Sequence, residues 1–421
     1  MTTPEVRLKD LCEDAGQYGL NVPASEYASA GVRMLRTTDL GPNGQLRDDV
    51  DPVFVGNPPG ARFLLDDGDL LLTRSGSVGR SFLVHALSDP TTFAGFLIRF
   101  RPRPSTDPRF LAYVAESTPF QDAVQADAIS STIQNFNAER YANIKVPNPP
   151  LDEQRRIADF LDTETARLDG LAAARIEQFG SLRERALAVL ADELCGRGEP
   201  GRRIATGWPW MPDLPAAWDV GPVFAYYDVQ LGKMLNQERA SGRHQRPYLR
   251  NANVHWYDID TTDLAEMSFE PEERRRYRVE VGDLLICEGG AGVAEAAIWQ
   301  GDVPEIYFQK SLHRCRPIGD LPSEWLMHWL RLAKAAGVFT ADGNLATIPH
   351  LTGEQLRSYR IPIPIDGAAW VARIRAALAR TDSAAEALKE SVEVMKERRQ
   401  ALITAAVTGQ LEVTTARGGR T

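Results

Sequence analysis

The sequence has 421 residues, enough for two or three domains that each bury a core of their own. Its hydrophobic content of 43% and charged content of 25% are typical of a globular protein, and no apolar run reaches the roughly 18 residues that a membrane span needs. The first residues lack the apolar core of a secretory signal, and the four cysteines form no CxxC pair, which argues against a zinc knuckle or a disulfide framework. We therefore expect a cytoplasmic protein with reduced thiols and no metal site.

The net charge of −9 argues against a chain that is basic throughout, but it leaves room for local anion binding. Residues 233–250 contain five basic side chains and one acidic side chain, Glu238, so their local charge is five minus one, or +4. The stretch 152–194 carries instead an excess of acidic residues. Basic residues gathered on loops could bind phosphate even though the whole chain is acidic.

The first part of the chain, residues 1–147, is predicted to form a mixed domain of strands and short helices. Strands are expected at 69–73, 81–85 and 97–101, with loops rich in Gly, Pro and Asp between them.

A long helix is predicted within the segment 148–195, after a Pro-rich stop at 148–151. Apolar residues recur there at a spacing of eleven, which is three helical turns and keeps an apolar seam almost straight. One row is Ile157, Leu168, Phe179 and Leu190, and the second is Phe160, Leu171 and Leu182. Such a long helix needs a partner helix to cover its seam.

The remaining chain repeats this order. Residues 196–213, rich in Gly, Pro and Arg, are predicted to be a linker; residues 214–364 a second mixed domain; residues 365–413 a second long helix; and residues 414–421 a frayed tail. The seam of the second helix follows a heptad: Val371, Ile374, Leu378, Thr381, Ala385, Leu388, Val392, Met395, Arg399, Leu402 and Ala406.

The two mixed domains are copies of one another, about 215 residues apart. Six sequence blocks match in one order, among them residues 68–71 with 282–285 and the pair Thr132-Ile133 with Thr347-Ile348. Phe93, Leu97, Arg99, Arg101 and Pro102 return as Phe308, Leu312, Arg314, Arg316 and Pro317. The period is far longer than that of a solenoid repeat, so it indicates a duplicated domain followed by a duplicated helix. The matched arginines are expected to be structural.

Antiparallel packing of the two long helices is the simplest way to bury both seams. It predicts an α+β fold in which two similar mixed α/β domains are joined by two long antiparallel helices that form a coiled coil, with a pseudo-twofold internal repeat. The alternative is that each helix forms a separate bundle with other chains.

No catalytic constellation is recognised in the sequence. The two Asn-Pro-Pro runs, at 57–59 and 148–150, lack the aromatic residue that follows in amino-methyltransferases. The Gly-rich runs at 74–80 and 288–296 lack the Lys-Ser/Thr ending of a P-loop. The six histidines show no metal-ligand spacing. A binding protein is therefore favoured.

The polar loops are the candidate binding surface, because the two copies keep their apolar frame and differ at these positions. Arg, Asn, Gln, Ser and Thr are the residue types that bind base edges and phosphates. The candidates are Arg36, Thr37, Thr38, Arg74, Ser75, Ser77 and Arg80 in the first copy, and Lys233, Arg243, Arg246, Arg250, Asn251, Asn253, Gln309, Lys310 and His313 in the second. For any single arginine, a solvated surface charge or a structural salt bridge is an equally good interpretation.

Three motifs resemble those of the specificity subunits of type I restriction–modification systems. Residues 149–162 read PPLDEQRRIADFLD, similar to the family's PPLxEQxxIxxFLD; residues 248–254 read YLRNANV, similar to YLRxxNV; and residues 282–286 read GDLLI. The order of domain, helix, domain, helix agrees with that family. The start of the second helix departs from the pattern, because residues 365–368 read IDGA.

The resemblance implies that each mixed domain is a target-recognition domain that reads one half of a bipartite double-stranded DNA sequence. The coiled coil would set the spacing between the halves and dock two methyltransferase subunits, with motor–nuclease subunits joining that assembly. S-adenosylmethionine, ATP and Mg²⁺ would bind to those partners, and this chain would carry no cofactor, no catalytic residue and no membrane contact. The residues expected in docking or in the coiled coil are Glu153, Gln154, Ile157, Leu168, Leu171, Phe179, Leu182, Leu388, Met395 and Leu402.

Two other hypotheses remain open from the sequence. The chain could be a coiled-coil adaptor whose domains bind proteins without DNA, or a cryptic nuclease or methyltransferase. A steep salt dependence of DNA binding would separate the first of these from a DNA-binding subunit.

Overall fold

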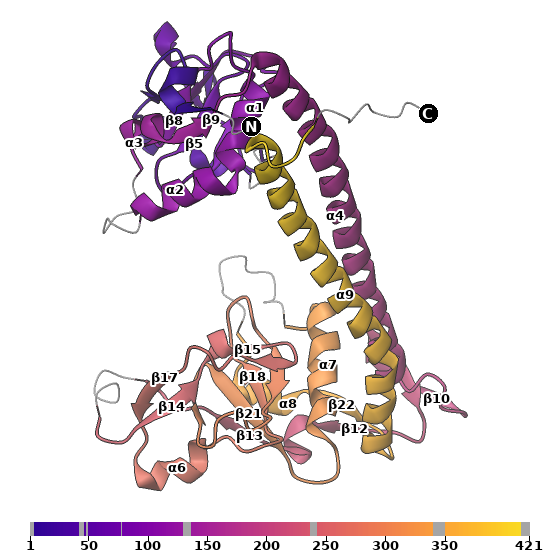
Figure 1. Ribbon diagram of the computed structural model, residues 1–421. Helices are drawn as coiled ribbons and strands as arrows, with labels where there is room; N and C mark the ends of the chain where they lie inside the picture. Colours follow the sequence, from indigo (N-terminus) through magenta and orange to yellow (C-terminus); the bar gives the residue numbers. More distant parts are fainter. Residues whose placement is uncertain are drawn as a thin grey trace. The chain divides into compact units, whose positions relative to one another are not determined.

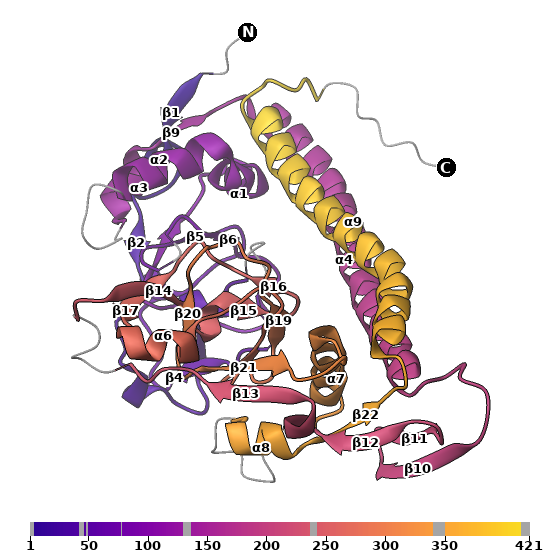
Figure 2. The same cartoon turned by 90° about the horizontal axis from the view of Figure 1, so that it is seen from below.

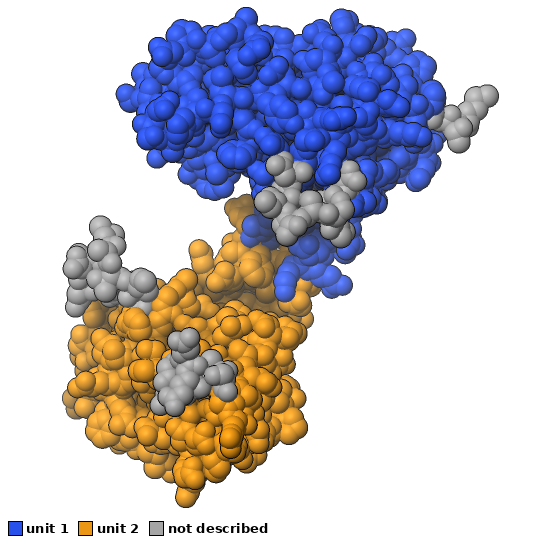
Figure 3. All heavy atoms as spheres, turned by 90° about the vertical axis from the view of Figure 1, so that its left-hand side faces the viewer, with its two compact units in different colours: residues 1–176, 389–421 blue, residues 177–388 orange. Residues whose placement is uncertain are grey.

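The computed structural model describes residues 4–41, 46–47, 49–76, 78–128, 136–235, 242–339 and 350–413. The chain divides into two compact units, Met1–Ile176 with Lys389–Thr421 (unit 1) and Glu177–Leu388 (unit 2), coloured separately in Figure 3. Each unit contains one mixed domain and one segment of each long helix. The repeated Thr-Ile pairs at 132–133 and 347–348 and the tail at 414–421 lie outside the described residues.

Unit 1 is built on three small sheets (Figure 1). The four-stranded sheet has the order β2 (Gln17–Tyr18), β8 (Leu97–Phe100), β5 (Leu70–Thr73) and β6 (Ser81–Leu83). The three-stranded sheet has the order β4 (Val53–Val55), β3 (Val32–Leu35) and β7 (Thr91–Phe93), and β1 (Glu5–Arg7) pairs with β9 (Lys145–Pro147). The predicted strands at 69–73, 81–85 and 97–101 are confirmed to within two residues. The helices are α1 (Pro108–Glu116), α2 (Thr118–Ala128) and α3 (Ala138–Asn143).

Unit 2 repeats this topology strand for strand. Its four-stranded sheet has the order β13 (Tyr227–Leu231), β21 (Leu312–Pro317), β18 (Leu284–Cys287) and β19 (Ala296–Ile298). Its three-stranded sheet has the order β17 (Ala265–Ser268), β14 (Gln245–Leu249) and β20 (Tyr307–Phe308), and β12 (Asp219–Pro222) pairs with β22 (Arg360–Ile363). A short pair joins β15 (Val254–His255) to β16 (Asp258–Ile259). The helices are α6 (Pro271–Tyr277), α7 (Ser323–Ala335) and α8 (Gly353–Ser358).

The registers of the two copies correspond as well. The parallel pair β3–β7 places Leu35 opposite Phe93, and the parallel pair β14–β20 places Leu249 opposite Phe308. These residues are buried in both units, as the repeated sequence blocks predict. The duplication inferred from sequence is therefore a duplication of fold.

The matched arginines hold the four-stranded sheets together, so their predicted structural role is confirmed. In unit 1, Arg101 forms a two-pronged ion pair with the buried carboxylate of Asp69, with N–O distances of 2.7 and 2.7 Å. In unit 2, Arg316 does the same with Asp283, at 2.7 and 2.8 Å. Such bidentate, charge-assisted pairs fix geometry as well as charge.

Arg99 and Arg314 are buried beside these pairs. The Arg99 guanidinium donates to the carbonyls of Arg62 and Leu64, and the Arg314 guanidinium donates to those of Arg276 and Arg278. Each arginine therefore ties a loop to its sheet by way of backbone carbonyls.

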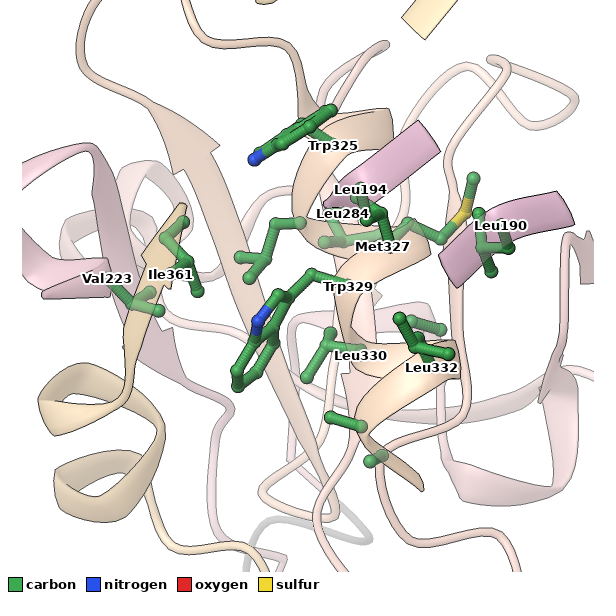
Figure 4. Close-up of a cluster of buried hydrophobic side chains, with 14 of the residues drawn as sticks. Leu190, Leu194, Val223, Leu284, Trp325, Met327, Trp329, Leu330, Leu332 and Ile361 are labelled. Atoms are coloured by element: carbon green, nitrogen blue, oxygen red, sulfur yellow. The ribbon is translucent and has the colours of Figure 1, made fainter. Parts of the chain in front are cut away.

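The core of unit 2 is rich in tryptophan (Figure 4). Trp325 and Trp329, both on α7, pack with Leu284 of β18 and with Leu190 and Leu194 of the first long helix. The Trp325 indole donates to the carbonyl of Pro362 at 2.8 Å, which satisfies its buried N–H group. The long helix is thus part of the core of this domain.

The two long helices are α4 (Leu151–Leu194) and α9 (Gly367–Val407). They are slightly shorter than the predicted spans 148–195 and 365–413. In unit 1, Ile157 and Leu161 of α4 share a core with Ile403 and Ala406 of α9. In unit 2, the end of α4 shares a core with the start of α9, and the two helices run in opposite directions in both views (Figures 1 and 2). The predicted antiparallel pairing is confirmed.

The heptad seam predicted for α9 is confirmed, since each of its positions is buried or half-buried. On α4 the buried and half-buried positions also follow steps of three and four, through 154, 158, 161, 165, 168, 172, 175, 179, 182 and 186. The row of Ile157, Leu168, Phe179 and Leu190 lies on the covered side. The second eleven-residue row was wrong at Leu171, which is 42% exposed. The buried seam repeats every seven residues, so a row with a spacing of eleven does not stay on it.

The predicted linker at 196–213 was also wrong, because most of it is structured. Strands β10 (Arg203–Trp208) and β11 (Met211–Pro215) form an antiparallel hairpin, visible in Figure 2. Trp208 stacks on Trp210, and Trp210 contacts Trp329 of the unit 2 core. The Gly residues that indicated a linker adopt positive φ, and Arg203 forms an ion pair with Asp213.

The two long helices start differently. Gln154, predicted as a docking residue, is buried: its side-chain oxygen accepts from the Asp107 amide at 2.9 Å and its nitrogen donates to the Pro149 carbonyl at 2.9 Å. It therefore anchors α4 to the first domain. At the start of α9, Asp366 accepts from the Ala369 amide, and Trp370 packs edge-on against Trp218.

The substitution Gln154→Ala should lower the stability of unit 1. It would leave the Asp107 amide and the Pro149 carbonyl without partners, at a cost of about 1–3 kcal/mol. Thermal unfolding followed by circular dichroism would measure this, with the exposed Arg156→Ala as the matched control. An equal melting temperature for both variants would contradict the anchoring role.

Candidate nucleic-acid interface

Two tight turns occupy equivalent places in the two units. The β7–β8 turn of unit 1 consists of Ala94, Gly95 and Phe96, and the β20–β21 turn of unit 2 consists of Gln309, Lys310 and Ser311. In sequence, each turn lies between a matched Phe and a matched Leu of the repeat. The turns themselves share no residue.

Three backbone hydrogen bonds hold the β7–β8 turn to neighbouring loops. The Ala94 amide donates to the Leu35 carbonyl (2.8 Å), the Gly95 amide to the Leu20 carbonyl (2.7 Å), and the Arg74 amide to the Phe96 carbonyl (2.9 Å). The turn therefore lies between the loop that carries Arg36 and the loop that carries Arg74.

The same three bonds recur in unit 2. The Gln309 amide donates to the Leu249 carbonyl, the Lys310 amide to the Lys233 carbonyl, and the Glu288 amide to the Ser311 carbonyl, all at 2.9 Å. The loop of Arg250 and the loop of Glu288 thus flank the β20–β21 turn. The structure brings the three predicted loop regions together in each unit.

A glycine is required beside each turn. A Cβ atom on Gly19 would lie 2.2 Å from the Phe93 carbonyl oxygen, and one on Gly232 would lie 2.1 Å from the Gln309 carbonyl oxygen. Both contacts are with backbone, which cannot move without breaking the hydrogen bonds above. The close approach of the two strands explains why both copies keep glycine here.

The side chains that the turns display differ in chemistry. Phe96 is 58% exposed, which makes the first turn apolar at its tip. Lys310 is exposed in the second turn and forms no ion pair with any described residue. The Gln309 side chain accepts from the Ser311 hydroxyl at 3.0 Å. One backbone frame therefore presents two different surfaces.

The candidates of unit 1 lie around the β7–β8 turn. Arg36 is half-buried and paired with Asp39 at 2.9 Å, and the Arg36 guanidinium also donates to the Asp51 carbonyl. Thr38 is exposed and Thr37 is half-buried.

The other candidates of unit 1 follow β5. The Arg74 guanidinium lies over the Tyr18 ring at 5.1 Å, beside the half-buried Ser75. Arg80 donates to the Leu40 carbonyl at 3.0 Å. Ser77 lies outside the described residues.

In unit 2, several candidates lie around the β20–β21 turn. Asn251 donates from its side chain to the Gly289 carbonyl at 2.8 Å, and its amide donates to the Ser311 hydroxyl at 3.2 Å. Arg250 pairs with Asp263. Arg246, which lies 3.5 Å from Glu305, and the exposed Arg243 are instead at the other end of β14, away from this turn, because β14 runs parallel to β20.

Three predicted binding residues of unit 2 were wrong, because they are buried and bonded internally. Lys233 is 2% exposed, pairs with Glu273 and donates to the Ser268 carbonyl at 2.8 Å. Asn253 is 2% exposed and donates to the carbonyls of Asp260 and Asp263.

His313 is the third of these residues. It is fully buried, and its ring Nε2 lies 2.7 Å from the Leu351 carbonyl oxygen. Burial lowers the pKa of His313. A neutral, enclosed imidazole cannot reach a nucleic acid.

Phe96, exposed at the tip of the first turn, was not among the candidates from the sequence, although a sequence signal marks it. It is the residue between matched Phe93 and Leu97 that differs most in character from its counterpart, Ser311. Attention to polar residues alone excluded it.

On the long helices, the expected coiled-coil residues are covered to different degrees. Ile157 and Leu168 are buried, and the half-buried ones are Glu153, Phe179, Leu182, Leu388, Met395 and Leu402. None of the described helices is long and apolar enough to cross a membrane.

Comparison with known proteins finds a match over part of the first domain and of α4. Residues 60–178 match the family described as the type I restriction modification DNA specificity domain. This stretch is therefore similar to a type I specificity domain. It contains the β7–β8 turn and the start of α4, and unit 2 repeats the topology of the unit that contains it.

Curated relatives agree. The chain is 26% identical over 210 residues to the type I restriction enzyme EcoKI specificity subunit of Escherichia coli strain K12, which covers 49% of this chain and 43% of that protein. It is 30% identical over 106 residues to the StySPI specificity subunit of Salmonella potsdam, or 25% of this chain and 23% of that protein. The chain thus spans less than half the length of the curated relatives it matches. The resemblance to specificity subunits is confirmed, and the adaptor hypothesis is not favoured.

A solved structure has the same fold. A chain from a structure concerned with complex assembly and conformational transition of the type I R-M system superposes with a TM-score of 0.69 at 18% identity, over 97% of this chain and 98% of that one. The α+β fold class with two long helices is confirmed.

The substitution Gly232→Ala should distort the β20–β21 turn, because the new methyl group would overlap the Gln309 carbonyl. We expect a loss of roughly 1–3 kcal/mol in the free energy of unfolding, and faster hydrogen exchange at the Gln309 and Lys310 amides. Gly319→Ala is the control, since a Cβ there meets nothing within 4 Å. Unchanged exchange at both amides would contradict the role of Gly232.

Acid should destabilise the fold through its buried histidines. Burial lowers the pKa of His313, and burial together with nearby Arg331 and Arg375 lowers the pKa of His328 to about 4. Because both pKa values are depressed in the folded protein, the unfolded chain binds more protons below its histidine pKa of about 6.5. The free energy of unfolding should therefore fall as pH drops from about 6.5 towards 4.

Denaturant unfolding at a series of pH values would test this. His328→Gln should show a shallower fall than the unmodified protein, and the exposed His85→Gln should match the unmodified protein. A fall of equal steepness in all three proteins would rule out the proposed cause.

Proposed function

We propose that this chain is the DNA-specificity subunit of a type I restriction–modification complex. Each unit reads one half of a bipartite double-stranded DNA target with the loops around its turn. The observation that supports this most strongly is the pair of equivalent turns, held by the same three backbone bonds and carrying different side chains. A duplicated frame with divergent contact residues suits a target whose two halves differ.

The side chains around the turns have suitable chemistry. Arg and Lys bind guanine or phosphate, and Asn and Gln bind adenine. Arg74 and Thr38 in unit 1, and Lys310 in unit 2, are the contacts that we propose around the turns. With Lys233, Asn253 and His313 assigned to the core, the surface that remains is small and is concentrated at the loops.

The long helices are proposed to set the distance between the two half-sites and to dock two methyltransferase subunits. Their apolar seams are covered along both α4 and α9. Motor–nuclease subunits join the same assembly. S-adenosylmethionine, ATP and Mg²⁺ bind to these partners, and this chain contributes recognition without catalysis.

Methylation mapping is the direct test. The chain would be co-expressed with the methyltransferase subunit of its own system, and methylated adenines would be mapped across the host genome. We expect a bipartite motif with an unspecified gap. A random pattern, or one contiguous motif, would contradict the proposal.

Two further arms separate the roles. Removing one heptad from the middle of α4 and one from the middle of α9 should change the gap and leave both half-sequences unchanged. The purified chain alone, given DNA, Mg²⁺ and S-adenosylmethionine, should neither methylate nor cleave. A changed half-sequence at constant gap would contradict the role of the helices, and a product would contradict a non-catalytic subunit.

A further inference from the structure

The fold does not require the exposed phenyl ring of Phe96. Its counterpart in unit 2 is Ser311, and the same three backbone bonds hold both turns. The frame therefore forms without a phenyl ring at this position. Ala94 is buried and Gly95 has no side chain, so Phe96 is the one large side chain of the β7–β8 turn.

The neighbourhood of Phe96 is polar. The Phe96 carbonyl accepts from the Arg74 amide, and the turn also bonds to Leu35, which precedes Arg36. A single exposed apolar residue is common on protein surfaces. An exposed ring at the tip of a turn that is flanked by loops carrying Arg and Thr can combine an apolar base contact with polar contacts around it.

Resting on the proposed function, we propose that Phe96 reads a thymine in the first half-site by contact with its 5-methyl group. In the major groove this methyl group is the one apolar feature that distinguishes base pairs, and Phe is among the side chains that contact it. Loss of the contact exposes the methyl group and the ring edge to water, at a cost that corresponds to roughly fourfold in affinity per methyl group.

The second turn reads its half-site differently. Ser311 is turned towards its own loop, since its hydroxyl bonds with Gln309 and with the Asn251 amide. Lys310 is the exposed side chain of this turn, and an ammonium group donates to guanine O6 or N7. The second half-site is therefore insensitive to Phe96, and the first is insensitive to Lys310.

The experiment uses the full-length chain bound to its methyltransferase partner. A random duplex pool is selected for binding and sequenced, and the selected duplex is then made with deoxyuridine in place of each thymine in turn. Deoxyuridine lacks only the 5-methyl group. We expect one deoxyuridine in the first half-site to weaken binding by roughly fourfold.

Two variants separate this contact from a structural effect. Phe96→Ala should bind thymine and deoxyuridine equally at that position, and Phe96→Leu should keep part of the discrimination. Both should melt at the temperature of the unmodified protein, because the ring is exposed. Lys310→Ala, the matched change in the other turn, should relax the second half-site and leave the deoxyuridine effect intact.

The outcomes are distinct. If the pool yields a bipartite motif but no deoxyuridine in the first half-site weakens binding, or if Phe96→Ala discriminates as well as the unmodified protein, the Phe96 contact is refuted and the proposed function stands. If the pool yields no motif at all, the proposed function itself fails.

Discussion

The backbone bonds that tie one turn to two neighbouring loops are the constraint on which the candidate interface depends. In unit 1 they fix Ala94–Phe96 between the loops of Arg36 and Arg74, and in unit 2 they fix Gln309–Ser311 in the same way. Because these bonds use only main-chain groups, the side chains of the turn can change without loss of the frame. The adjacent glycines, Gly19 and Gly232, are the exception, since a side chain there would overlap the backbone. A binding surface that can diverge on a constant frame is what a protein with two different half-sites needs.

The charged groups of this acidic chain divide into two kinds. The paired arginines Arg101 and Arg316 are structural, each held by a buried aspartate that is preceded by the glycine of the GDLL block. Their ion pairs are partly buried and bidentate, so they fix the same local geometry in both copies of the fold. Lys310 and Arg243, in contrast, are exposed on loops. The net charge of −9 is therefore no measure of the potential at the candidate interface.

Regular patterns in the sequence were sufficient for much of the fold. The heptad of α9, the buried run of β5 and the matched Arg–Asp positions each follow from a local or repeated pattern, and the structure agrees with them. Individual site residues were harder, because their burial depends on remote partners. Each buried residue bonds to a distant partner. Lys233 bonds to a carbonyl 35 residues away, His313 to a carbonyl 38 residues away, and Gln154 to an amide 47 residues away. Spacing along the chain carries no information about such contacts.

The central claim is that the two turns share one backbone frame and that their side chains determine which bases each unit recognises. The most direct measurement is to replace Gly95-Phe96 by Lys-Ser, the corresponding residues of the second turn, and to map the methylated motif of the assembled complex. Ala94 is kept because it is buried against Met34 and Val55. Gly95 accepts a side chain, since a Cβ there lies 3.4 Å from its nearest neighbour, an ordinary contact. We expect the first half of the motif to change at the position that Phe96 contacts, with the second half and the gap unchanged. An unaltered first half, from a protein that remains folded and active, would contradict the claim.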